Sequence, residues 1–186
     1  MFIPSGGRQA RVPCNVEETE ERIVEIDQIL GLPAHPLLVH GVVTLIPLCA
    51  VGVALTALWP AARARLSLAV LVLTVFAVAL VPFVAESGEW LEERVGETAI
   101  LERHAELGDA FLPFAIALLV GAVAVAALRF VESRESGGDN SSGSRSAPRW
   151  LVILVVVVAL TTSVAAAYET YLVGHSGAVS VWSGVG

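Results

Sequence analysis

Charged side chains are scarce in this sequence. Only 16% of the 186 residues are charged and 6% are aromatic, whereas 55% are hydrophobic, and all eleven basic residues are arginine. A soluble domain usually carries about 25% charged residues and interrupts its apolar runs sooner. The shortage of charge therefore argues against a soluble fold. The absence of a basic patch argues against nucleic-acid binding.

Catalytic motifs are also missing from the sequence. It contains no Gly-x-Ser-x-Gly, no phosphate-binding Walker loop and no His-Glu-x-x-His. We therefore predict no hydrolase, transferase or nucleotide-binding activity, and leave open whether the protein is an enzyme. Cys14 lies in a polar segment and Cys49 in an apolar run, so we expect no disulfide between them.

Long apolar runs are abundant. Four of them predict membrane-spanning helices at about 36–59, 65–86, 108–130 and 149–172, because about 20 helical residues cross about 30 Å of hydrocarbon. Helices also satisfy their own backbone hydrogen bonds in lipid. The sequence thus predicts an all-α integral membrane protein, a four-helix bundle over residues 34–182 whose first partner is the lipid bilayer.

Two segments differ from this apolar domain. Residues 1–33 form a polar leader, in which Asn15 begins a predicted short amphipathic helix with Ile23, Ile26 and Leu30 on one face. Residues 132–148 are rich in serine and glycine and predict a flexible linker.

Arginine marks one side of the predicted bundle. Arg63 and Arg65 lie between the first two spans, and Arg129 and Arg149 flank the linker, whereas residues 86–109 between the middle spans are acidic. Basic residues near span ends favour the cytoplasmic side. We therefore predict that both termini lie outside the membrane. The exclusive use of Arg and the many Ala, Val and Gly residues are consistent with a GC-rich bacterial genome, and with the four spans they lead us to predict a bacterial inner-membrane protein.

The four histidines all fall at the predicted outer face. His35 and His40 begin the first span, His104 precedes the third, and His175 follows the fourth. Pro36 suits the first position of a helix, which places His35 just outside it and His40 about 6 Å deeper. An imidazole at that depth must face the bundle interior or meet lipid at a cost. We therefore favour His40 as a ligand and take His35 as a helix-start residue or second ligand.

The second and fourth spans end alike. Glu86-Ser87-Gly88 and His175-Ser176-Gly177 each place an ionisable residue before Ser-Gly. The chain therefore reads as two similar hairpins related by an axis along the membrane normal. This symmetry predicts that His40, Glu86, His104 and His175 converge, with Glu89 and Glu169 as further acids nearby.

Three interpretations of such a cluster stay open. Imidazoles from facing helices could be the axial ligands of a b-type haem, drawn from His35, His40, His104 and His175. Alternatively His40, His104, His175 and Glu86 could bind a divalent metal such as zinc, copper or iron. In the third interpretation the histidines bind nothing and only shape the helix ends.

The same residues carry a family resemblance. HPLLVH (35–40), GEW (88–90), RHAELGDAF (103–111) and GHSGAVSVW (174–182) occur in that order. The stretch from Leu32 to Trp182 resembles the bacterial membrane family named domain of unknown function 2231, whose members usually have Phe-Pro where Gly41 follows His40 here. The resemblance implies a four-span fold. Because relatives are joined to Rieske-type iron–sulfur domains, it also implies electron transfer.

The sequence therefore leads to one main hypothesis and two alternatives. The main one is a small integral membrane protein with a histidine-lined extracytoplasmic site that binds b-type haem or a metal for electron transfer. It would act with a redox partner or as a homo-oligomer. The alternatives are a cation-sensing or transport module and a membrane scaffold subunit without a cofactor. Ionisable groups deep in the spans, which a conducting path normally needs, are missing.

Overall fold

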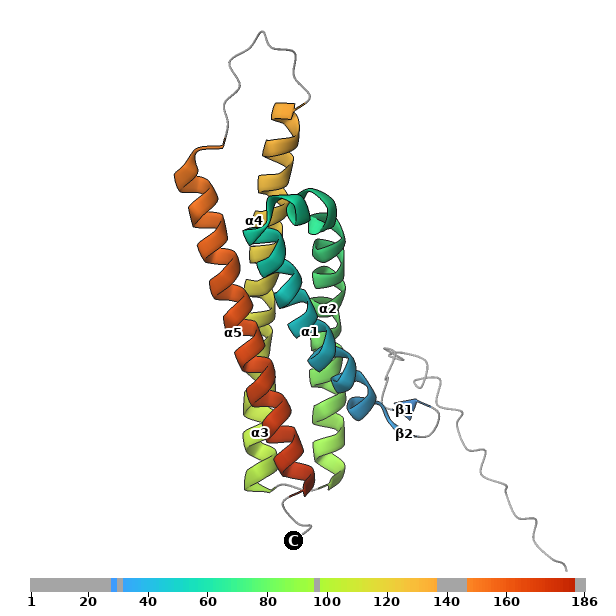
Figure 1. Ribbon diagram of the computed structural model, residues 1–186. Helices are drawn as coiled ribbons and strands as arrows, with labels where there is room; N and C mark the ends of the chain where they lie inside the picture. The colour runs from blue at the N-terminus through green and yellow to red at the C-terminus, as the bar shows by residue number, and fades with distance from the viewer. Residues whose placement is uncertain (1–27, 30–31, 96–97, 137–146, 183–186) are drawn as a thin grey trace, which may run out of the picture.

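The computed structural model describes residues 28–29, 32–95, 98–136 and 147–182, and nearly all of them are helical (Figure 1). Four helical stretches are long and apolar enough to cross a membrane, which confirms the predicted all-α membrane fold and makes this a multi-pass membrane protein. The elements are β1 (Gln28–Ile29), β2 (Leu32–Pro33), α1 (Ala34–Leu58), α2 (Pro60–Val95), α3 (Ala99–Asp109), α4 (Phe111–Ser136) and α5 (Arg149–Trp182).

The connections are shorter than the sequence predicts. Only Trp59 separates α1 from α2, because Pro60 begins the new helix at a position where its missing N–H costs nothing. The acidic stretch 86–109 is mostly helical instead of a loop: α2 continues to Val95, and α3 begins after Thr98, whose side chain accepts from the Leu101 N–H at 3.2 Å. Helix α5 likewise extends ten residues beyond the predicted end, to Trp182.

The third span is broken in two. Helix α3 ends at Asp109 and α4 begins at Phe111, with Ala110 as the capping residue between them. Pro113 explains the break, because it has no N–H for the Asp109 carbonyl and its ring crowds that carbonyl. His104 consequently lies on a short helix of its own.

The predicted leader helix lies mainly outside the described residues. Where the leader is described, Gln28–Ile29 pairs with Leu32–Pro33 in an antiparallel ladder, so these residues are not helical. Most of the predicted linker, residues 137–146, also lies outside the described part, and α4 reaches further into it than expected, to Ser136.

The helices form two hairpins packed side by side. Helix α1 packs on α2 and α5, and α4 packs on the same two helices, so α1 and α4 lie diagonally across the bundle (Figure 1). Large apolar side chains such as Val51, Val72 and Val164 are exposed on the outside of the bundle. Because water would oppose so many exposed apolar groups, the outer surface suits lipid.

The two hairpins are related position by position. A shift of 69 residues carries the buried Val42, Ile46, Cys49 and Val53 of α1 onto Phe111, Ala115, Leu118 and Ala122 of α4, all buried. A shift of 89 residues carries the buried Thr74, Ala77 and Val81 of α2 onto Ser163, Ala166 and Thr170 of α5, again all buried. The burial pattern of the first hairpin thus repeats in the second, as the prediction of two similar hairpins requires.

An ion pair clasps the hairpins together at the end opposite the histidines. Arg63 of α2 is 3% exposed, and its Nε and Nη2 donate to the Glu132 carboxylate of α4 at 3.0 and 3.1 Å. Its Nη1 also donates to the Ala57 carbonyl at 2.9 Å, near the end of α1. One guanidinium thus joins three helices.

Candidate metal-binding site

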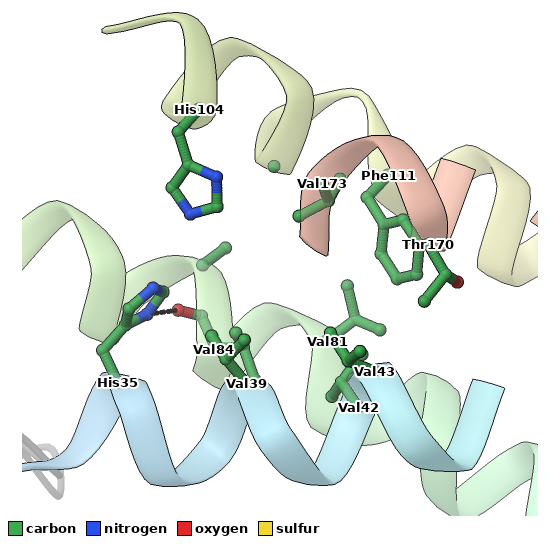
Figure 2. Close-up of a pocket in the computed structure, with 12 residues that line it drawn as sticks. His35, Val39, Val42, Val43, Val81, Val84, His104, Phe111, Thr170 and Val173 are labelled. Carbon is green, nitrogen blue, oxygen red and sulfur yellow. Dashed lines mark hydrogen bonds between the residues drawn. The ribbon is translucent and has the colours of Figure 1, made fainter. Parts of the chain in front are cut away.

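His35 and His104 lie close together although they are 69 residues apart in the sequence. His35 stands in the first turn of α1 and His104 in the middle of α3. Their ring centres are 6.4 Å apart and the ring planes are inclined by 77°. Figure 2 shows the two imidazoles, one from each helix, at the same end of the residues that line a cavity. The shift of 69 residues that relates α1 to α4 also relates these two residues.

The His35 ring is held by α2. Its Nδ1 lies 3.0 Å from the Val84 carbonyl oxygen and 3.3 Å from Ser87 Oγ. A carbonyl oxygen only accepts hydrogen bonds, so Nδ1 carries the hydrogen and donates it. The Ser87 hydroxyl donates its own hydrogen to the same Val84 carbonyl at 2.9 Å, so it can only accept from the ring. In the neutral ring the unprotonated nitrogen is therefore Nε2.

The His104 ring is held by α5 in the same way. Its Nδ1 lies 2.9 Å from Ser176 Oγ, and that hydroxyl donates its hydrogen to the Val173 carbonyl at 2.9 Å. Since the hydroxyl hydrogen is committed, Ser176 accepts from the ring, and Nδ1 is again the protonated nitrogen. Val84 and Val173, like Ser87 and Ser176, are related by the shift of 89 residues.

Each histidine ring packs against a glycine, whose missing side chain leaves room for the ring. A Cβ added to Gly88 would lie 2.9 Å from His35 Cε1, and one added to Gly177 would lie 3.0 Å from His104 Cε1. Any larger residue would push the ring away. Each hairpin therefore repeats one arrangement: a histidine on the first helix, bonded to the serine and packed on the glycine of a Ser-Gly pair on the second.

The two rings close one end of an apolar cavity of about 60 Å³ (Figure 2). Its lining follows the same symmetry: Val39 and Gly108, Val42 and Phe111, Val81 and Thr170, and Val84 and Val173 are related pairs. Among the lining residues no side chain is acidic or basic apart from the two histidines. The space is large enough for an ion or a few waters.

The other predicted site residues lie elsewhere. His40 is exposed, and its Nδ1 bonds back to the Pro36 carbonyl of its own helix. His175 is exposed and stacks on Tyr171, with ring centres 5.8 Å apart. Glu86 and Glu89 are also exposed, and Glu169 is half-buried.

The predicted convergence of His40, Glu86, His104 and His175 is therefore wrong. In the described part of the chain, no three His, Cys, Asp or Glu side chains lie close enough to share a metal. Helical geometry is the reason: His40 follows His35 by five residues, which turns it about 140° around α1 to the outer surface. Likewise Glu86 and His175 precede the serines that face the rings, and so point elsewhere.

Ser87, Gly88, Ser176 and Gly177 were missed as functional residues. The sequence did indicate them, because Ser-Gly is what the tripeptides at 86–88 and 175–177 have in common. The shared residues contact the histidines, and the differing residues, Glu86 and His175, do not lie at the cavity.

Comparison with known proteins does not indicate a family or a function. No protein-family model, no curated protein and no solved structure matches the chain. The resemblance to domain of unknown function 2231 stays a prediction. The functional argument therefore depends on the geometry of the histidine pair.

Proposed function

We propose that the protein is a small electron-transfer protein of the bacterial inner membrane that holds a redox metal between His35 and His104. The metal is either the iron of a b-type haem or a bare ion. The arginines at the opposite end of the bundle, Arg63, Arg65, Arg129 and Arg149, support an orientation in which this site faces the extracytoplasmic side and both termini lie outside. A redox partner would then dock at that face.

One observation carries the proposal: both imidazoles are fixed in the form that binds metals. Metal-bound histidines usually donate one ring N–H to a carbonyl or other acceptor, which orients the ring and leaves the other nitrogen free. His35 and His104 both do so through Nδ1. Two Nε2 lone pairs directed into one apolar space repel each other, and a cation between them removes that repulsion.

The spacing of the rings supports the same conclusion. A metal bonded to both Nε2 atoms at about 2.0–2.1 Å, with the two bonds pointing in opposite directions, would separate the ring centres by roughly 6–6.5 Å. The separation of 6.4 Å agrees with this value. Both rings are fixed by neighbouring helices, so the site is arranged before any metal arrives.

The two imidazoles suit a b-type haem as ligands, but the cavity between the helices is small for it. Two facing imidazoles are the axial ligands that a b-type haem requires, and the bound iron would supply one-electron chemistry. The cavity of about 60 Å³ is nevertheless much smaller than pockets for cofactor-sized ligands, which are about 300–1,000 Å³. A bare ion fits the described arrangement, whereas a macrocycle is larger than the cavity.

A visible spectrum with metal analysis tests the proposal. The protein is expressed with haem precursor, iron and copper supplied, purified in detergent, and measured before and after dithionite. We expect either a Soret band with sharper α and β bands on reduction, or about one equivalent of metal without haem. His35→Ala and His104→Ala should lose the bound group, and His40→Ala, a matched control on the outer face of α1, should retain it. Absence of both haem and stoichiometric metal in the folded wild-type protein would sink the proposal.

A further inference from the structure

We infer that, as a bare-ion site, the His35–His104 pair selects copper in its +1 state and binds it in two-coordinate geometry between the two Nε2 atoms. This inference rests on the proposed metal site but not on haem. Binding forms two nitrogen-to-copper bonds and releases the ligands that the ion carried; no electron moves and no proton is released from the neutral rings.

The number of donors argues for a two-coordinate ion. Within the described residues, the cavity offers two imidazole nitrogens and no carboxylate or thiolate. Structural zinc almost always takes four protein ligands, and catalytic zinc takes three. Copper(I) is a d¹⁰ ion that accepts two ligands on opposite sides, and imidazole is a suitable donor for copper. The two rings lie 6.4 Å apart across the end of the cavity, which leaves room for one ion between them.

The charge of the surroundings argues for a monovalent ion. The described residues that line the cavity are uncharged, and the acids Glu86 and Glu89 on neighbouring α2 turns are exposed. The cost of burying an ion in an apolar medium rises with the square of its charge, so a divalent ion costs about four times as much as a monovalent one. Without an anionic ligand, Zn²⁺ or Fe²⁺ is therefore disfavoured at this site.

The same features favour the reduced state of copper. Copper(II) prefers square-planar or tetragonal sites with nitrogen and oxygen ligands, which two facing rings do not form. The apolar lining also disfavours its extra charge. The site should therefore bind Cu(I) much more tightly than Cu(II), which is the condition for a high reduction potential.

Anaerobic competition with a chromophoric Cu(I) chelator tests this inference on the full chain in detergent. We expect one equivalent of Cu(I), similar binding of Ag(I) as a redox-inert substitute, and binding of Zn²⁺ at least about 100-fold weaker. X-ray absorption of the Cu(I) form should show two nitrogen neighbours. His104→Ala should lower Cu(I) affinity by more than about 100-fold, and His175→Ala, an exposed histidine of α5, should leave it unchanged.

The outcomes separate this inference from the proposed function. Binding of Zn²⁺ as tight as Cu(I), or three or more copper ligands, would overturn the copper inference. Binding of haem without Cu(I) would overturn it too, yet leave the redox proposal standing. Binding of neither would overturn both. If His104→Ala fails to fold, Gly177→Ala, which only crowds the His104 ring, provides a second variant, and unchanged Cu(I) affinity there would count against the site.

Discussion

The two hairpins hold their histidines by the same contacts but on differently built helices. His35 lies at the start of the continuous α1, directly after the fully buried Ala34, whereas His104 lies on α3, an eleven-residue helix none of whose residues is buried. Ala110 separates α3 from α4. The comparison teaches that one histidine is anchored in the bundle and the other is carried by a short helix with no buried residue.

The clasp between the hairpins gives the largest expected effect. Arg63→Ala would leave the Glu132 carboxylate without its guanidinium and the Ala57 carbonyl without that donor. Breaking a buried ion pair costs about 3–5 kcal/mol, and we expect about 2–3 kcal/mol because Glu132 is partly exposed. Denaturant unfolding in detergent would measure the loss. Arg65→Ala, an exposed arginine on the same helix, should be near neutral. An equal loss of stability in that variant would show that the Arg63–Glu132 ion pair has no special role.

The paired glycines test whether the hairpins are equivalent. Gly88→Ala and Gly177→Ala should each displace one imidazole and weaken metal binding by about 10–100-fold, because each new Cβ would fall within about 3 Å of a ring carbon. Gly41→Ala, whose Cβ meets nothing within 4 Å, is the matched control. A loss in only one of the two variants, measured by metal competition, would show that the hairpins do not share the site equally.

The paired serines give a smaller effect that should be unequal. Ser176 Oγ lies 2.9 Å from His104 Nδ1, whereas Ser87 Oγ lies 3.3 Å from His35 Nδ1, which also has the Val84 carbonyl at 3.0 Å. We therefore expect Ser176→Ala to lower metal affinity by about tenfold and Ser87→Ala by less. The same competition assay measures both variants. A larger effect of Ser87→Ala would contradict the view that the Val84 carbonyl holds the His35 ring in place without the serine.

Hydrogen exchange of the unsubstituted protein gives the smallest expected difference. Helices with few buried contacts open more easily than core helices. Amides of α3 should therefore exchange faster than those of α1 near His35, and bound metal should slow them. Equal protection of the amides of α1 and α3 without metal would contradict the view that α3 holds its histidine less rigidly than α1 does.

The sequence predicted the fold well and the site only in part. Apolar runs fixed the four spans, and the repeated Ser-Gly showed the two hairpins, because both signals are local in the chain. His40 was favoured over His35, but the structure places His35 at the cavity and His40 on the outer surface, because the depth of a residue in a helix does not tell which way its side chain faces. The break at Ala110 and the extension of α2 to Val95 depend on the contacts of Pro113 and on helix packing, which hydropathy does not report.

The most direct test of the histidine pair is ¹⁵N NMR of the imidazoles in histidine-labelled protein, with and without the bound metal. Without metal, His35 and His104 should show a protonated Nδ1 and a bare Nε2. Addition of metal, or incorporation of haem, should shift the Nε2 signals of these two residues and leave those of His40 and His175 unchanged. Shifts at His40 or His175 in place of His35 and His104 would contradict the assignment of the site.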